Sequence, residues 1–319
     1  KFVHSVGRRL QAGALAALLL AGLITVGGGS ATAGAYSRPG LPVETLMVPS
    51  AAMGRDVMVR FQGGGPKAVY LLDGLRARDD NSGWDIETTA FEDYFESGLS
   101  VVMPVGGMSS FYTNWQGPAV GNGTTYNYQW ETFLAKELPP LLQQGWRATD
   151  VRAAAGVSMG GTAAINLAAQ HPNQFRQVLS FSGYLATTIP GGQTALRAAL
   201  LDGGMYNVNA MWGGTFDPRR YENDPFLNMG NLRGRDVYVS AGSAIPGPAD
   251  AKYKPEHQAA GIALEGVANA TTRAWSAKAN ATGVRHTAVF TPTGLHNWDQ
   301  FGSQLEATKP RILNVMNAW

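Results

Sequence analysis

A glycine-rich turn between an apolar run and a helical run constrains the fold of this chain more than any other feature. Residues 151–157 form a strand-like run that is apolar from residue 153 onward, the turn is Gly156-Val-Ser158-Met-Gly160, and a helical pattern follows over residues 161–170. In so tight a turn the central residue takes strained backbone geometry, and the flanking glycines remove Cβ atoms that would collide with neighbouring elements. The pattern therefore predicts Ser158 as a nucleophile above the carboxyl edge of a sheet, with the Met159 N–H facing the reaction centre.

The turn belongs to a regular alternation of strand-like and helix-like segments. Strands separated by helix-length segments indicate βαβ units. We therefore expect an α/β class fold of the α/β-hydrolase type, with a mostly parallel central sheet and helices on both faces. The predicted strands are residues 69–72, 99–105, 151–157, 177–181, 236–240 and 286–291, and the predicted helices are residues 84–96, 130–138, 161–170 and a C-terminal helix from Asp299.

Residues 185–231 interrupt this alternation. The segment is poor in strand signals and rich in glycine, tryptophan and tyrosine, and we interpret it as an insertion over the top of the sheet. A chain of 319 residues is near the upper limit for one hydrophobic core, and α/β folds commonly fill that length as one domain. We expect a single catalytic domain over residues 34–319.

The first 33 residues have the layout of a secretory signal. A basic start is followed by an apolar run over residues 10–26 and by small residues ending in Ala31-Thr-Ala33. A retained membrane anchor is the alternative, but a glycine-interrupted run of about 17 residues is short for a membrane span. We expect a signal peptide over residues 1–33, cleaved after Ala33 or Ala35, and a secreted protein of the cell envelope.

Charge and cysteine content exclude several classes of protein. The chain has 25 Lys and Arg residues against 23 Asp and Glu residues, and three of the basic ones lie in the predicted signal. No run rich in Lys or Arg is present, so nucleic-acid binding has no electrostatic basis here. There is no cysteine, which excludes a cysteine nucleophile and a cysteine-based metal site.

A serine nucleophile needs a base, and in this fold the order along the chain is serine, acid, histidine. His296 follows the last predicted strand, where the base belongs, and His286 at the start of that strand is the alternative. His171 ends a helix and His257 lies in a polar segment, so we expect structural and solvated roles for them.

The acid is not decided by spacing. It should follow the strand at residues 236–240, which leaves Asp250, Glu256 and Glu265. Asp250 is nearest, whereas Glu265 lies on an apolar helical stretch, where a carboxylate is either a paired functional group or an exposed residue.

Several runs, spread over nearly the whole mature chain, form a recognisable set: Ser37–Val43, Met53–Asp56, Tyr70–Ala77, Gly83–Asp85, Ser97–Gly107, Trp130–Leu134, Asn223–Pro225 and His296–Trp298. Together they resemble the mycolyltransferases of the antigen 85 type. The resemblance implies an exported enzyme that moves a mycolyl group from trehalose monomycolate onto a second trehalose monomycolate or onto arabinogalactan, without a metal or an organic cofactor.

Carried over position by position, the resemblance assigns site roles. It implies Ser158 as the nucleophile and His296 as the base, and it selects Glu265 as the acid, although the spacing from Glu265 to His296 is one residue shorter than usual. The remaining positions are the backbone amides of Leu75 and Met159 as the oxyanion hole, Asp73 and Arg76 as trehalose-binding residues, and Trp298 beside the base.

Asp73 and Arg76 follow a strand end, from which they can hydrogen-bond sugar hydroxyls at the rim of the site; a turn-forming aspartate and a solvated arginine are the alternative. An aromatic face such as that of Trp298 suits a sugar ring. A long acyl chain needs an apolar trough, and we expect residues 185–212 to supply it.

The sequence also departs from the family pattern. The usual disulfide loop is replaced by residues 119–125, which we expect to be looser, and Ala241 stands where a free cysteine is common. The turn has Gly160-Gly161 where a larger small residue often comes first. Fibronectin binding is not inferable, because residues 91–96 differ from the family at several positions.

Two other functions fit the same features. A secreted carboxylesterase would share the fold and the three residues but give the acyl group to water. A non-catalytic cell-wall binding protein is the second, because some relatives in this family lack the nucleophile; the presence of Ser158, Glu265 and His296 together argues against it.

Overall fold

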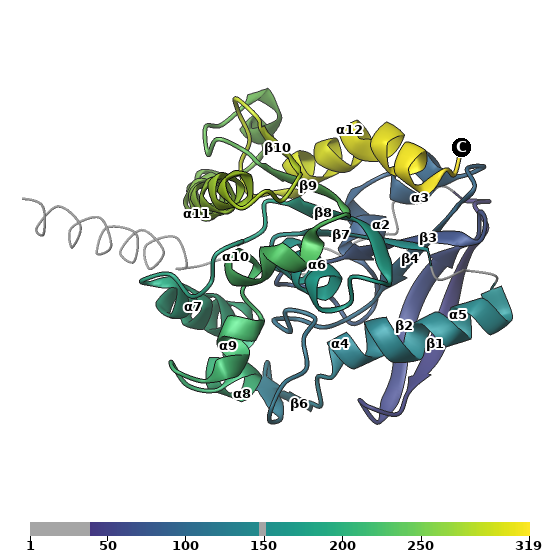
Figure 1. Ribbon diagram of the computed structural model, residues 1–319, viewed down its shortest axis with the longest axis horizontal. Coiled ribbons are helices and arrows are strands. Elements are labelled where there is room, and N and C mark those ends of the chain that lie inside the picture. The colour runs from purple at the N-terminus through teal and green to yellow at the C-terminus, as the bar shows by residue number, and fades with distance from the viewer. Residues whose placement is uncertain (1–38, 147–150) are drawn as a thin grey trace, which may run out of the picture.

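An eight-stranded sheet forms the centre of the molecule in the computed structural model, which describes residues 39–146 and 151–319 (Figure 1). Its strand order is β1-β2-β4-β3-β7-β8-β9-β10. The pairs β1–β2 and β2–β4 are antiparallel, and every pair from β4 to β10 is parallel. The strands are β1 (Val43–Ser50), β2 (Arg55–Gln62), β3 (Lys67–Leu72), β4 (Leu99–Pro104), β7 (Arg152–Val157), β8 (Phe175–Phe181), β9 (Asp236–Ala241) and β10 (Thr287–Phe290).

All six predicted strands are confirmed, because they are the parallel strands of the sheet. A strand buried on both faces is a continuous apolar run, and β4 and β7 are buried at every residue. The sequence analysis did not predict β1 and β2. In β1, buried and exposed side chains alternate toward its end, which is the weaker signal of an edge strand with one solvated face.

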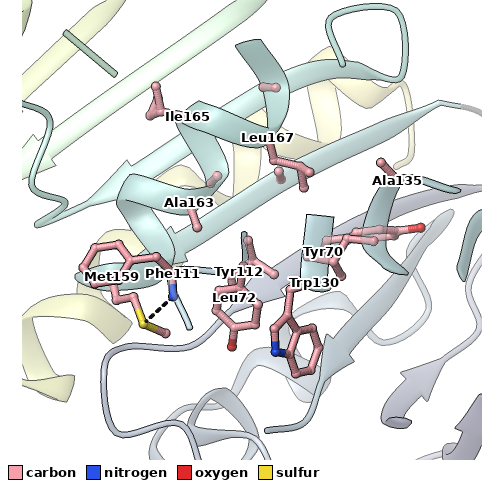
Figure 2. Close-up of a cluster of buried hydrophobic side chains, with 14 of the residues drawn as sticks. Tyr70, Leu72, Phe111, Tyr112, Trp130, Ala135, Met159, Ala163, Ile165 and Leu167 are labelled. Carbon is pink, nitrogen blue, oxygen red and sulfur yellow. Dashed lines mark hydrogen bonds between the residues drawn. The ribbon is translucent and has the colours of Figure 1, made fainter. Parts of the chain in front are cut away.

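Helices cover both faces of the sheet, so the predicted fold class is confirmed. On one face, side chains of α6 and of the α4–α5 segment pack with Tyr70 and Leu72 of β3 (Figure 2). Side chains of α11 belong to the same cluster. On the other face, side chains of α2, α3 and α12 pack with Val69 and Leu71 of the same strand. The helices are α2 (Gly83–Glu87), α3 (Ala90–Tyr94), α4 (Trp130–Thr132), α5 (Leu138–Trp146), α6 (Met159–Gln170), α7 (Gly192–Gly204), α8 (Val208–Trp212), α9 (Pro218–Glu222), α10 (Pro225–Asn228), α11 (Pro255–Ala281) and α12 (Trp298–Met316).

Two predicted helices differ from the observed ones. The predicted helix at 84–96 is two short helices, because Thr88 breaks it: its hydroxyl accepts from the Ala90 N–H and donates to the Trp84 carbonyl. The predicted helix at 130–138 continues to residue 146 and contains a π-helical turn, η1 (Phe133–Glu137). Hydrophobic spacing does not detect either feature, since the buried face is nearly the same.

The segment 185–231 contains no strand, as predicted, and folds as α7 to α10 followed by the 3₁₀ turn η2 (Met229–Leu232). Its buried side chains, such as Leu200 and Trp212, belong to the same core cluster as β3 and α6. The segment is therefore packed as part of the main core.

A small hairpin occupies the segment where the family has its disulfide loop. Its strands are β5 (Ala119–Gly121) and β6 (Thr124–Tyr126), joined through Asn122 and Gly123 with φ values of +50° and +72°. Positive φ at both turn residues matches the twist of a two-residue hairpin. A Cβ atom on Gly121 would lie 2.5 Å from the Tyr206 ring, so the hairpin is packed closely against the segment before α8.

The predicted signal at residues 1–33 lies outside the described residues. Within residues 39–146 and 151–319, no helix combines the length and the apolar character that a membrane span needs.

Candidate active site

The strained turn predicted from the sequence is present between β7 and α6. Ser158 has φ +53° and ψ −121°, a left-handed conformation that is rare for a residue with a side chain. A Cβ atom on Gly156 would lie 2.2 Å from the Gly160 carbonyl oxygen, and one on Gly160 would lie 2.4 Å from the Leu72 and Asp73 carbonyl oxygens. Glycine is therefore required at both positions to hold Ser158 in this geometry.

The structure brings the three predicted side chains into one hydrogen-bonded chain. His296 Nε2 lies 2.8 Å from Ser158 Oγ, and His296 Nδ1 lies 2.7 Å from Glu265 Oε2. Ser158 directly precedes α6, Glu265 lies on α11, and His296 lies in the loop between β10 and α12. The Glu265 side chain is fully buried and that of His296 is 7% exposed. The three hydrogen-bonded side chains are therefore shielded from water except on the side of the serine.

Of the three candidate carboxylates, Glu265 contacts the histidine, and Asp250 and Glu256 do not. Asp250 is buried in the 3₁₀ turn η3 (Pro248–Lys252), where it accepts from the Gly247 N–H at 2.7 Å and from Asn297 Nδ2 at 2.6 Å. It therefore anchors the residue next to His296. Glu256 is exposed in the first turn of α11.

The three other histidines in the described part of the chain lie away from the serine or line its cavity. His286 is bonded to Ser276 Oγ at 2.7 Å and packs edge-on against Trp275. His171 caps α6 and pairs with Glu131 at 2.9 Å. His257 is exposed, as predicted, and also lines the cavity in front of Ser158.

The loop after β8 supplies two residues that the sequence analysis missed. Ser182 Oγ donates to Glu265 Oε1 at 2.6 Å, and the Gly242 N–H donates to the same oxygen. Tyr184 places its hydroxyl 3.5 Å from His296 Nε2. A signal for them exists: the carboxyl ends of neighbouring parallel strands meet at one edge, and β8 pairs with the nucleophile strand β7.

The two predicted oxyanion-hole positions lie beside Ser158. Met159 is the first residue of α6, so its N–H has no intrahelical acceptor and the helix dipole favours negative charge in front of it. Leu75 follows Gly74, whose position is so close to the serine that a Cβ there would lie 3.6 Å from Ser158 Cβ. Both residues line the cavity that contains the serine and the histidine.

Asp73 lies in the floor of the cavity and not at its rim, because it is only 1% exposed. Its carboxylate accepts from the Gly83 N–H at 3.0 Å and from Ser82 Oγ at 3.3 Å, at the start of α2. Burial raises the pKa of Asp73 from 3.8 to about 7, and these donors offset only part of the rise.

Arg76 and Trp298 lie nearer the solvent. Arg76 forms an ion pair with Asp202 of α7 at 2.6 Å, and its side chain is 47% exposed. The Trp298 ring packs edge-on against Trp84 at 5.4 Å and so closely over Gly83 that a Cβ there would lie 2.3 Å from it. Asp73 thus lies below Trp298 and Arg76 lies at the opening.

A cavity of about 510 Å³ opens in front of Ser158. The predicted trough segment contributes to its wall through Ile189, Leu196 and Ala199. Leu264 and Val267 of α11 also line it. The cavity therefore joins a reactive polar end to an apolar wall, which fits a substrate with a polar head and an acyl chain.

Comparisons with known proteins agree with this geometry. The esterase family model matches residues 50–312. The chain is 46% identical to the diacylglycerol acyltransferase/mycolyltransferase Ag85B of Mycobacterium intracellulare, with 99% of this chain and 96% of that protein covered.

Among solved structures, MPT51 (FbpC1) of Mycobacterium tuberculosis is similar, with a TM-score of 0.76, 33% identity, and 86% of this chain and 99% of that one covered. The Staphylococcus aureus fluorophosphonate-binding serine hydrolase FphF shares the fold, with a TM-score of 0.64 at 15% identity over 85% of this chain and 98% of that one. The chain therefore belongs to the esterase family and, within it, to the Ag85 diacylglycerol acyltransferase/mycolyltransferases.

Proposed function

We propose that this protein transfers a mycolyl group from trehalose monomycolate to a second trehalose monomycolate or to arabinogalactan, through an ester on Ser158. The observation that carries the proposal is the hydrogen-bonded chain Ser158–His296–Glu265 at the polar end of an apolar-walled cavity. Family membership supports the acyl group and the type of reaction.

In the first step, His296 Nε2 takes the proton of Ser158 as Oγ attacks the ester carbonyl of the donor. Glu265 orients the imidazole through Nδ1 and stabilises the cation that forms. The amides of Leu75 and Met159 donate to the oxygen that becomes negative. His296 then returns the proton to the departing trehalose oxygen, which leaves the acyl group on Ser158.

In the second step, the hydroxyl of an acceptor sugar gives its proton to His296 Nε2 and attacks the acyl carbon. The bond from that carbon to Ser158 Oγ breaks, and Oγ recovers the proton from the histidine. No group outside the chain, the donor and the acceptor is needed to balance either step.

In this proposal, different parts of the cavity wall bind the sugar and the acyl chain of the substrate. Trp298 offers an aromatic face to a sugar ring, and Arg76 at the opening and Asp73 in the floor offer hydrogen bonds to sugar hydroxyls. The apolar side chains of α7 and α11 receive the part of the acyl chain next to the ester.

Intact-protein mass spectrometry with trehalose monomycolate tests the proposal. We expect an acyl adduct on the wild type that trehalose monomycolate then consumes, with dimycolate as the main product. Ser158→Ala should lose the adduct and about 10⁶-fold of the turnover.

Free mycolic acid as the main product would indicate the alternative, a secreted carboxylesterase. Absence of any turnover in the wild type, as in Ser158→Ala, would indicate a non-catalytic binding protein.

We also propose that the protein acts outside the cytoplasm, after loss of residues 1–33. The basic, apolar and small-residue order of that segment supports the proposal. Sequencing the amino terminus of the protein from culture medium and cell wall should give a start at residue 34 or 36. A protein that retains residues 10–26 would contradict the proposed cleavage.

A further inference from the structure

Tyr184 is held rigidly by the helix that carries the nucleophile. Its N–H donates to Thr162 Oγ1 at 2.9 Å, and Thr162 Oγ1 donates to its carbonyl at 3.1 Å. Thr162 lies in the first turn of α6, and its own N–H donates to the Ser158 carbonyl. Thr162 therefore fixes the position of the Tyr184 backbone relative to Ser158, because it is hydrogen-bonded to the backbone of both residues.

The Tyr184 hydroxyl lies where a reacting oxygen has to come. It is 3.5 Å from His296 Nε2, and the two rings lie 5.8 Å apart at a tilt of 36°. A separation of 3.5 Å is too long for a strong hydrogen bond with the histidine, and the hydroxyl also interacts with the Ser158 side chain. When the serine is esterified, the hydroxyl is able to donate to an oxygen that enters beside the histidine. Tyr184 also lines the substrate cavity.

The second step of the reaction creates the need for such a donor. Once Ser158 Oγ is esterified, it no longer donates to His296 Nε2, and the attacking hydroxyl takes its place. That hydroxyl gives its proton to Nε2 and keeps lone pairs that accept from a second group. Burial raises the pKa of Tyr184, so the phenol stays protonated and acts as a donor.

We propose that the Tyr184 hydroxyl holds the acceptor sugar hydroxyl against His296 and thereby favours transfer to a sugar over transfer to water. This inference rests on the proposed transfer function. A sugar hydroxyl is attached to a bulky ring and needs to be oriented, whereas a water molecule orients itself freely.

Tyr184 keeps its proton during the reaction. The acceptor proton moves to His296 Nε2 and then to Ser158 Oγ, the acceptor oxygen bonds the acyl carbon, and the Tyr184 proton remains on the phenol throughout. Tyr184 is thus a residue that determines specificity between acceptors.

The test is the ratio of glycolipid formed to free mycolic acid released from trehalose monomycolate, measured for the wild type and for Tyr184→Phe. Phenylalanine keeps the ring against His296 and removes only the oxygen. We expect this ratio to fall about tenfold, as the loss of one hydrogen bond predicts. The apparent KM for the acceptor should rise, and the rate of Ser158 acylation, followed by burst kinetics, should change by less than about threefold.

Tyr70→Phe is the matched control. It removes a buried β3 hydroxyl that has no hydrogen-bond partner among the described residues. The Tyr70 ring packs against Phe175, away from the cavity. We expect an unchanged ratio for this variant. Thermal melts of both variants check the fold.

Equal loss of transfer and hydrolysis in Tyr184→Phe, with the ratio preserved, would overturn the inference and leave the transfer function intact. If the wild type itself released only free acid, the proposed function would fail, and the inference with it.

Discussion

Glu265 is a fully buried carboxylate whose two oxygens are both occupied. Oε1 accepts from Ser182 Oγ and from the Gly242 N–H, and Oε2 accepts from His296 Nδ1. A buried charge is stable only when it is paired and hydrogen-bonded, and this one has three donors. The same bonds that make the charge tolerable fix the imidazole with Nε2 toward Ser158.

Glu265→Gln should lower kcat by about 10⁴-fold with little change in fold. The amide still accepts from Ser182, but its NH₂ group faces His296 Nδ1 and favours the wrong tautomer. Single-turnover acylation of Ser158 measures the effect.

Asp250→Asn is the matched control, because that carboxylate is also buried but accepts from the Gly247 N–H and from Asn297, beside the histidine, and not from the imidazole. Its effect should be far smaller, on the order of tenfold. A larger loss in Asp250→Asn than in Glu265→Gln would contradict the assignment of the acid.

Asp73 should make stability depend on pH. Its pKa is raised by burial from 3.8 to about 7, so the folded protein keeps a proton that the unfolded chain releases above about pH 4. The contribution of Asp73 to the free energy of unfolding should therefore be largest below about pH 4. It should be lost as the pH rises through about 7.

Asp73→Asn is neutral throughout and should lose that part of the slope. Urea unfolding of both proteins from pH 4 to 8 provides the measurement. Parallel slopes in the two proteins would show that Asp73 does not titrate as its burial implies.

At this scale the sequence predicted the serine from the motif and the histidine from its place after the last strand. Spacing left the acid open, and only the family resemblance selected Glu265. Ser182 and Tyr184 were missed because a loop position shows no periodicity; only the sheet order places the end of β8 beside β7.

Among the elements, α11 has two contacts with the reactive site. It carries Glu265, and one turn earlier the Gly261 carbonyl accepts from the His296 N–H at 3.2 Å. A Cβ atom on Gly261 would lie 3.2 Å from Leu295 Cβ, which is tighter than an ordinary contact. The helix therefore positions both the acid and the loop that carries the base.

Gly261→Ala should lower kcat about tenfold, because the loop at Leu295 and His296 has to move by a few tenths of an ångström. Gly266→Ala, on the same helix with nothing within 4 Å of the new Cβ, should leave kcat unchanged. It should raise the free energy of unfolding by about 1 kcal/mol through helix propensity. Denaturant unfolding and steady-state kinetics of the pair measure both effects, and equal behaviour of the two variants would exclude a role for the close contact.

Element prediction worked where burial made the pattern simple. The central parallel strands, such as β4 and β7, are buried on both faces, so they were predicted almost to the residue. The β1–β2 hairpin, the break at Thr88 and the π turn at residues 133–137 were missed because they depend on edge position and local hydrogen bonds.

For the whole molecule, the segment at residues 185–231 shares the core with the sheet. Trp212 Nε1 donates to Thr113 Oγ1, and Trp275 Nε1 of α11 donates to the carbonyl of Pro225 at the start of α10. These bonds join the segment to loops and helices from both halves of the chain. We therefore expect it to unfold together with the sheet.

Thermal unfolding should show one transition, with the same midpoint by far-ultraviolet circular dichroism, tryptophan fluorescence and loss of turnover. This would support the prediction of one domain over residues 34–319. An earlier loss of turnover than of circular dichroism would show that residues 185–231 open separately.

The order of the reactive residues along the chain has a consequence for biosynthesis. Ser158 precedes His296 by 138 residues, and Glu265 precedes it by 31. A chain is synthesised from its amino end, so the serine emerges long before the imidazole. A serine hydroxyl without a base is a poor nucleophile, and the nascent protein therefore does not attack the lipids and esters around it. Its reactivity begins only when the loop after β10 has folded against α11.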